Sequence, residues 1–222
     1  MRGGAGRAVR PGGYSFPAGE TVGYWDDAAR WTNDNQEHIL PPHWSDPFLA
    51  ESGTLYVTNT QPAATADNAN PWLYAFWLRT PQTNPNPGVL HLTTNAHLKA
   101  WELGCASSSE EAQFGIIQID AGAYAEVGSL EVGRSGSGIV TNQGTIRHSA
   151  EIWIGRNTGS SGRLVHCDGA TMKNTNPKDL YVGQQGHGEL LVRDATFDWY
   201  WWSDSGFREA APSWSASRPP AA

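Results

Sequence analysis

The sequence predicts an all-β protein that folds as a parallel β-helix, a solenoid of about six coils. Three observations support this prediction. A glycine-containing segment recurs three times between Leu130 and Phe197. Apolar residues in and around these segments alternate with a period of two, which is typical of strands. No window of the sequence offers a sustained apolar stripe with the spacing of a helix.

The three clearest copies of the segment begin at Leu130, Ile152 and Leu180. Each copy contains an alternating apolar pair, a glycine, a small polar turn and a second glycine. A second alternating pair, another turn and an apolar anchor then follow. Self-similarity at a period of roughly 20 to 50 residues indicates a repeat architecture. Each copy therefore predicts two or three short strands joined by turns.

A weaker form of the repeat extends towards the N-terminus. The glycine that opens each second strand falls at Gly53, Gly88, Gly115, Gly138, Gly162 and Gly188. Ten of the twelve residues found two and four positions after these glycines are aliphatic, and alternation places all twelve on one face of a strand. Because one coil cannot bury such a face alone, we expect the coils to stack. The predicted internal column consists of Leu55, Leu90, Ile117, Val140, Leu164 and Leu190.

Two glycine-rich segments, LYVGQQGHGELLV from Leu180 and LEVGRSGSGIV from Leu130, resemble the repeats of autotransporter passengers and related bacterial surface proteins. The segment YWDDAARWTN, from Tyr24, resembles the tryptophan-containing leader that often precedes such repeats. The resemblance is good over roughly 130–197 and weak over 20–130. It implies a right-handed parallel β-helix. It is less informative about function, because such repeats occur in adhesins, surface-layer components and enzyme scaffolds.

The repeats divide the chain into four parts. These are a flexible N-terminal tail (1–20), an N-terminal cap (21–52), the β-helix repeats (53–197) and an aromatic C-terminal cap with a tail (198–222). Trp25, Trp31 and Trp44 lie in the predicted N-terminal cap, which would cover unpaired backbone groups at the open end of the solenoid. The aromatic run at the C-terminal end is expected to cap the solenoid, to bind a ligand or to mediate self-association. Its residues are Trp199, Tyr200, Trp201 and Trp202.

The amino-acid composition argues against some classes of function and favours others. The net charge is −7 and only 17% of residues are charged, which argues against nucleic-acid binding, since phosphates demand clustered lysine and arginine. No stretch reaches the roughly 18 apolar residues of a membrane span. No signal peptide is visible, because the positive start lacks an apolar region. The low lysine content and the many Gly, Asn, Thr, Ser and Trp residues nevertheless indicate an extracellular or cell-surface location.

Aspartates recur in the turn after the second strand of each repeat, at Asp120, Asp168 and Asp194. Asp is a turn former that hydrogen-bonds its own backbone, so we expect structural roles and no cofactor. The alternative is a row of carboxylates along one edge that holds a calcium ion, which prefers oxygen ligands, or that supports acid–base chemistry. Asp168 and Asp194 are expected at matched positions in adjacent coils, with Arg193 pointing to the opposite side of its strand.

Asn142 and His166 replace inward aliphatic residues in adjacent coils. If the register holds, they stack inside the solenoid, where each can satisfy a polar group of the other. We therefore expect an internal structural pair. The two cysteines, Cys105 and Cys167, are expected to be free thiols on different faces.

The sequence contains no recognisable catalytic or phosphate-binding motif. The expected function is that of a non-enzymatic extracellular or surface protein, structural or adhesive, built on the β-helix. The first alternative is a carbohydrate-binding module or fibre segment, with Trp and Tyr stacking on sugars. The second alternative is a polysaccharide lyase or glycoside hydrolase. Expected partners are glycans or a host or matrix surface, together with self-association.

Overall fold

The computed structural model describes a chain that is nearly all β. The described residues are 13–15, 22–33, 35–38, 40–41, 46–49, 53–61, 72–80, 87–106, 113–176 and 178–198. The predicted C-terminal patch from Trp199 to Trp202, the residue Trp44 and most of the predicted N-terminal tail lie outside these ranges. Within the described ranges, no helix is long and apolar enough to cross a membrane.

Two sheets make up the fold. Sheet B contains seven strands, all parallel: β2 (Val22–Tyr24), β5 (Gly53–Val57), β8 (Gly88–Leu92), β10 (Phe114–Ile119), β12 (Ser137–Asn142), β15 (Ser161–Cys167) and β18 (His187–Arg193). Sheet A contains β1 (Gly13–Ser15), β3 (Thr32–Asn33), β4 (Asp46–Leu49), β6 (Thr60–Gln61), β7 (Leu73–Leu78), β9 (His97–Cys105), β11 (Tyr124–Val132), β13 (Thr145–His148), β14 (Ile152–Ile154), β16 (Thr171–Asn174), β17 (Leu180–Val182) and β19 (Thr196–Asp198). A 3-10 turn, η1 (Ala28–Arg30), precedes β3.

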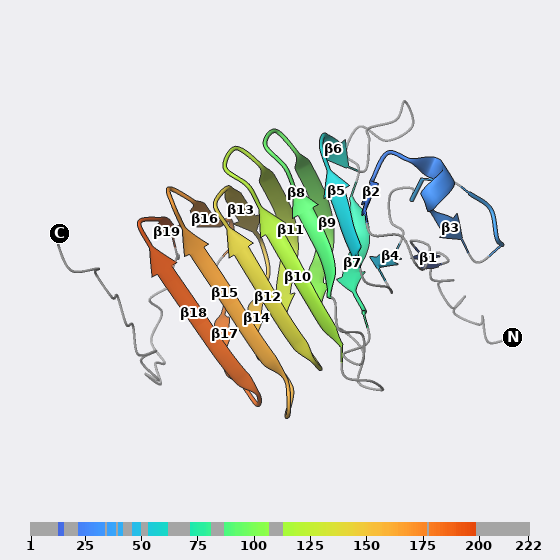
Figure 1. Cartoon of the computed structure of the whole chain (residues 1–222). Helices are drawn as coiled ribbons and strands as arrows, with labels where there is room; N and C mark the ends of the chain where they lie inside the picture. Colours follow the sequence, from blue (N-terminus) through green and yellow to red (C-terminus); the bar gives the residue numbers. More distant parts are fainter. Residues whose placement is uncertain are drawn as a thin grey trace, which may run out of the picture.

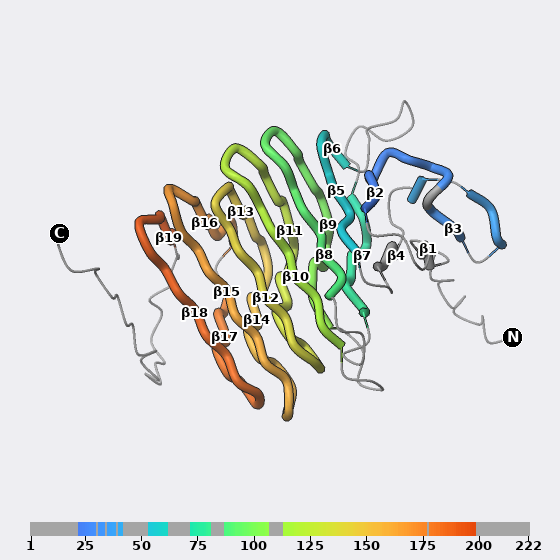
Figure 2. Tube along the Cα trace, viewed as in Figure 1, coloured from blue at the N-terminus to red at the C-terminus, as the bar shows by residue number. Residues whose placement is uncertain are grey.

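The two sheets are faces of one β-solenoid of about four turns. Each strand of sheet B from β8 onwards leads through a turn into a strand of sheet A, and the chain then returns to sheet B one coil further on (Figures 1 and 2). Pairing is parallel in both sheets, and the described exception is the antiparallel pair of β1 and β3. The predicted parallel solenoid is therefore confirmed.

A corner bends the strands of sheet A. In β11, Val127 and Leu130 both face the core although they are three residues apart, so the inward phase shifts by one residue between them. In the next coil the strand breaks at this level into β13 and β14, which pair with the two halves of β11. The corner separates the outward side chains of these strands into those before it and those beyond it.

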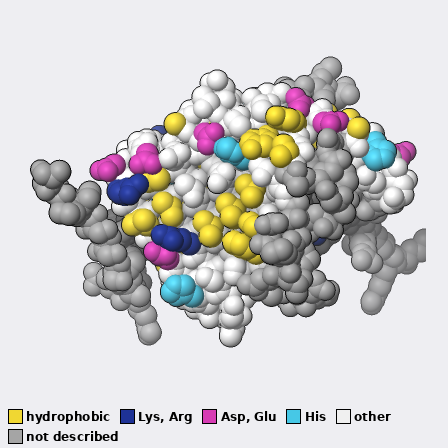
Figure 3. Space-filling model, in the orientation of Figure 1, with side chains coloured by type: hydrophobic (Ala, Val, Ile, Leu, Met, Phe, Trp, Pro, Cys, Tyr) yellow, Lys and Arg dark blue, Asp and Glu magenta, His cyan; other side chains and the backbone are white. Residues whose placement is uncertain are grey.

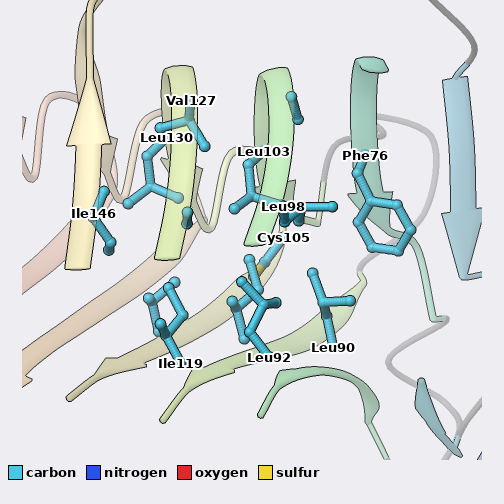
Figure 4. Packing of buried hydrophobic residues seen from close by; sticks show 14 of the residues in the cluster. Phe76, Leu90, Leu92, Leu98, Leu103, Cys105, Ile119, Val127, Leu130 and Ile146 are labelled. Carbon is cyan, nitrogen blue, oxygen red and sulfur yellow. The ribbon is translucent and has the colours of Figure 1, made fainter. Parts of the chain in front are cut away.

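The glycine register predicted from the sequence is present in sheet B. The six glycines form consecutive Cα partners from β5 to β18, and so do the six residues of the predicted internal column. The five residues from Leu55 to Leu164 are fully buried, whereas Leu190 in the last strand is partly buried. Figure 4 shows the core between the sheets, where Leu90, Leu92 and Ile119 face side chains of sheet A.

Glycine is required where coils approach closely. A Cβ atom at Gly138 would lie 2.5 Å from the backbone nitrogen of Gly133 and 2.8 Å from the Cβ of Cys105. Such contacts are shorter than real Cβ atoms tolerate, so a larger residue would separate the coils. Cys105 and Cys167 are both free and buried.

The internal polar pair is also found as predicted. Asn142 and His166 are Cα partners in β12 and β15, and both are fully buried. The side-chain nitrogen of Asn142 lies 2.9 Å from Nδ1 of His166. The Asn142 Oδ1 atom accepts a hydrogen bond from the backbone N–H of Gly144, so both ends of the amide are used.

Tryptophans extend the core at its N-terminal end. Trp25 and Trp31 are buried, with ring centroids 4.9 Å apart, and Trp25 lies 5.4 Å from Phe76 of β7. The Trp31 indole N–H donates to the backbone oxygen of Trp25. This bond meets the need of a buried indole for an acceptor.

Candidate functional site

Asp168 and Asp194 occupy matched turn positions in adjacent coils, as predicted. Cys167 and Arg193 are the last paired residues of β15 and β18, and each is followed by an aspartate with a left-handed backbone, with φ values of 56° and 49°. The Gly169 N–H donates to the Asp194 carbonyl oxygen at 2.7 Å, which ties the two turns together. These turns form one edge of the solenoid, along the top of Figure 1, and we call them the turn edge.

Side chains of the protein itself satisfy the Asp168 carboxylate. Gln143 donates to Oδ2 at 2.8 Å, and the Cys167 thiol donates to the same oxygen at 3.3 Å. Arg193 donates to Oδ1 at 3.5 Å. The expectation that Arg193 points away was wrong, because its side chain reaches back to the preceding coil. The Gln143 bond, followed by the Cys167 bond and the nearby Arg193 charge, holds the pKa of Asp168 below its usual value.

Asp120 does not join this row. Ile119 pairs with Asn142, so Asp120 lies level with Gln143, one position before the level of Asp168. Its carboxylate instead contacts Nε2 of His91 at 2.8 Å. Within the described ranges, no group of three or more His, Cys, Asp or Glu side chains is arranged to hold a metal ion.

The Asp120–His91 pair belongs to an aromatic row on the outer face of sheet B. Tyr24, Tyr56 and His91 are consecutive Cα partners, with ring centroids 5.7 and 5.1 Å apart. Tyr24 is 51% exposed. We call these three residues with Asp120 the tyrosine–histidine row. Figure 3 looks onto this side of the molecule, where hydrophobic side chains gather among histidine and acidic ones.

Sequence reasoning missed this row, although a signal for it exists. Tyr56 and His91 are each the third residue after a repeat glycine, at Gly53 and Gly88, and this position faces outward in every coil. The alternation that places the second and fourth positions in the internal column also places the third position on the outer face.

A second set of outward side chains runs along sheet A beyond its corner. In this order, its consecutive Cα partners are Trp77, Gly104, Glu131, Trp153 and Tyr181. We call them the outer column. The Trp153 and Tyr181 rings stack with centroids 6.0 Å apart and planes 7° from parallel.

Glu131 is the buried charge of the outer column. Arg156 donates to its Oε1 at 2.6 Å, and Nε of Arg134 lies 3.4 Å from its Oε2. Burial raises the pKa of Glu131 above its usual value, against the pull of the two guanidinium groups. The same arginines cover aromatic rings, since Arg134 lies 5.7 Å from the centroid of Trp77 and Arg156 lies 4.3 Å from that of Trp153.

The fold and these surfaces define the chain as a β-solenoid protein whose coils are joined by buried columns and by polar side chains. Comparisons with protein families, with curated proteins and with solved structures found no match. The functional inference therefore depends on the chain's own residues.

Proposed function

We propose that this chain is a non-enzymatic extracellular or cell-surface protein, structural or adhesive, in which the β-solenoid is the scaffold. The observation that carries this proposal is that polar side chains are bonded from one coil to the next. Examples are the pairs Gln143–Asp168, Asn142–His166 and Glu131–Arg156, whose members are 25, 24 and 25 residues apart.

Such bonds have a direct structural effect. A side chain that is held by a side chain of the next coil resists separation of the two coils. Parallel coils contact only their neighbours, so solenoid stability is a sum of coil and interface contributions. Bonds at each interface suit a scaffold that must stay folded outside the cell.

The proposal includes finer features of the fold. The six glycines in register support six coils, and the resemblance to autotransporter passengers supports right-handed winding. The packing of Trp25 against Trp31 and Phe76 supports an aromatic cap at the N-terminal end. At the other end, four apolar residues of the last coil are only partly buried, which leaves room for the aromatic segment after Asp198 to act as a cap. These residues are Leu180, Val182, Leu190 and Phe197.

The last coil also supports self-association, the second role proposed for the aromatic segment. Light scattering over a wide concentration range should then show a mass that rises with concentration. The variant Trp201→Ser should reduce this rise. A constant monomer mass for both proteins would contradict self-association.

Two measurements test the scaffold proposal. Antibody labelling of intact and permeabilised cells should give equal signals if the chain lies at the surface, and a signal only after permeabilisation would contradict this location. Incubation with a panel of polysaccharides should release no reducing or unsaturated sugars. Product release by the purified protein that disappears in a Glu131→Gln or Asp120→Asn variant would instead identify a polysaccharide-active enzyme.

The tyrosine–histidine row favours glycan binding as a second candidate function. Rings on a flat sheet offer apolar faces to the C–H groups of sugars, and the His91–Asp120 pair offers hydrogen-bonding groups beside them. Affinity electrophoresis in gels that contain a soluble polysaccharide tests this candidate. Retardation should be lost in Tyr24→Ala and kept in Tyr74→Ala, whose tyrosine lies on sheet A. For every polysaccharide tested, equal migration in gels with and without the polysaccharide would contradict glycan binding.

A further inference from the structure

Two tryptophans of sheet A share an unusual arrangement in which the indole ring lies over a glycine of the next coil. Trp77 in β7 is the Cα partner of Gly104, and a Cβ atom at Gly104 would lie 2.8 Å from Cε3 of the ring. Trp101 in β9 lies level with Gly128, where a Cβ atom would lie 2.9 Å from Cδ2 and 3.0 Å from Cε3. Each glycine therefore makes room for one face of a ring.

The two rings differ in what else covers them. The Arg134 guanidinium covers Trp77, which is only 4% exposed. Trp153, three positions further along the outer column, is covered in the same way by Arg156. Trp101 is 47% exposed, and in the described part of the chain no cation lies over its ring.

The surroundings of Trp101 extend this open surface. Tyr74 lies at the same level in the neighbouring strand β7 and is 39% exposed. The two residues lie on the far side of the solenoid from the tyrosine–histidine row, since they belong to sheet A and the row to sheet B. Two exposed aromatic side chains thus lie at one level on adjacent strands of sheet A.

The charge beside the open ring is negative. Glu102 follows Trp101 in β9 and is the Cα partner of Ser129, two residues before Glu131, and its charge is one of the smaller causes that raise the pKa of Glu131. Among the described residues, no lysine, arginine or histidine forms an ion pair with Glu102. The nearby Lys99 is already paired with Glu126 at 3.8 Å. A carboxylate without an ion-pair partner among the described residues thus belongs to the residue that follows the exposed Trp101, in a chain of net charge −7.

We propose that Trp101 and Glu102 form a recognition site for an arginine side chain in a basic segment of a partner protein. The guanidinium would stack on the open indole face, as Arg134 does on Trp77, while its N–H groups reach the Glu102 carboxylate. Arginine fits better than lysine, because a planar and weakly hydrated guanidinium stacks on aromatic faces and donates through a fixed fork. This site goes beyond the proposed scaffold, because it gives the chemistry of a partner that the surface would hold.

Fluorescence anisotropy with a labelled oligoarginine peptide tests the site in the full chain at fixed ionic strength. Trp101→Ala should weaken binding by about two- to thirtyfold, the range expected for loss of a cation–π contact. Glu102→Gln should also weaken it, whereas Tyr24→Ala, which removes an equally exposed ring from sheet B, should not. An oligolysine of the same length should bind more weakly and should lose less on Trp101→Ala. In two-dimensional NMR, the spectrum of Trp101→Phe identifies the indole N–H signal of Trp101, because that signal is missing from it. In the wild type, this signal should shift when the peptide is added.

Other outcomes would overturn the proposal. Equal affinity of the wild type, Trp101→Ala and Glu102→Gln for oligoarginine would show only general attraction to an acidic protein. Loss of polysaccharide retardation in Trp101→Ala with unchanged oligoarginine binding would assign the ring to a glycan instead. Circular dichroism checks that each variant is folded. Should Trp101→Ala unfold, the indole signal and the Glu102→Gln titration decide the matter on folded protein.

Discussion

Asn142 and His166 lie one coil apart inside the solenoid, with the Asn142 side-chain nitrogen 2.9 Å from Nδ1 of the imidazole. The other ring nitrogen, Nε2, lies 2.8 Å from the backbone oxygen of Thr196 and donates to it. Nδ1 must therefore accept a hydrogen from Asn142, and the imidazole is neutral. The two bonds connect three successive coils through one buried side chain.

Stability should fall in acid because of this arrangement. Burial lowers the pKa of His166 below its ordinary value of 6.5, against a smaller raising effect of the Thr196 bond. The unfolded chain then binds a proton more readily than the folded one, so stability is fully present above pH 6.5 and is lost as the pH falls towards the folded pKa. Thermal melts across this window should show a falling melting temperature. His166→Asn, which cannot take up the proton, should reduce this fall. An unchanged pH profile in His166→Asn would contradict the assignment of this loss of stability to His166. It would point instead to His97 or His148, whose pKa values are also lowered by burial.

Leu164 and Arg163 test the inward phase of β15. Leu164→Ala should cost about 2–5 kcal/mol of unfolding free energy, as truncations of buried leucine do. Arg163 lies on the opposite face, where it forms an exposed ion pair with Glu189 at 3.2 Å, so Arg163→Ala should change stability by about 0.5 kcal/mol or less. Urea unfolding curves give both values. Equal losses would show that the strand faces are assigned incorrectly.

The charge of Glu131 should contribute little to stability at neutral pH, although it lies between two guanidinium groups. Burial raises the pKa of Glu131, so the cost of burying the carboxylate outweighs the attraction of Arg134 and Arg156. Glu131→Gln should therefore cost no more than about 1 kcal/mol of unfolding free energy, because the arginines that it leaves unpaired are partly exposed. Glu189→Gln, which breaks an exposed pair, is the matched control and should cost about 0.5 kcal/mol or less. Guanidinium unfolding would mask charge effects, so the comparison belongs in urea. A loss of several kcal/mol in Glu131→Gln, far above that of the control, would show that the two ion pairs outweigh the burial of the carboxylate.

Calcium should have no effect on the melting temperature. Gln143, Cys167 and Arg193 already satisfy the Asp168 carboxylate, which leaves little reason for a cation at the turn edge. Melts with added calcium and with a chelator should therefore coincide. Stabilisation by calcium that disappears in Asp168→Asn would contradict this expectation and would make the turn edge a binding site.

The spacing of the glycines was enough to predict which residues stack inside sheet B. The alternation of inward and outward side chains is a local property of a strand. A glycine that permits close approach of the coils, such as Gly138, recurs at the same level in each coil. Leu55 and Leu90 could therefore be matched although their glycines are 35 residues apart. Asn142 and His166 could be matched for the same reason.

The turns could not be aligned in this way. Four residues separate the paired positions Ile119 and Tyr124, whereas two separate Asn142 and Thr145, so equal distance from a strand does not mean equal level in the turn. Asp120, however, lies five residues after Gly115, whereas Asp168 lies six after Gly162, so Asp120 is one level earlier than Asp168 and contacts His91 instead.

The sequence alone determined the strand phase, the glycine register and the internal column, because each follows from the short-range rules of β-strands. Only the tertiary structure decided which outward side chains meet. Arg193 reaches back to Asp168, Arg156 covers both Glu131 and Trp153, and Trp101 lies open above Gly128. These contacts join residues of different coils. They depend on the direction of each side chain and on the corner in sheet A, and the spacing of residues along one strand determines neither of these.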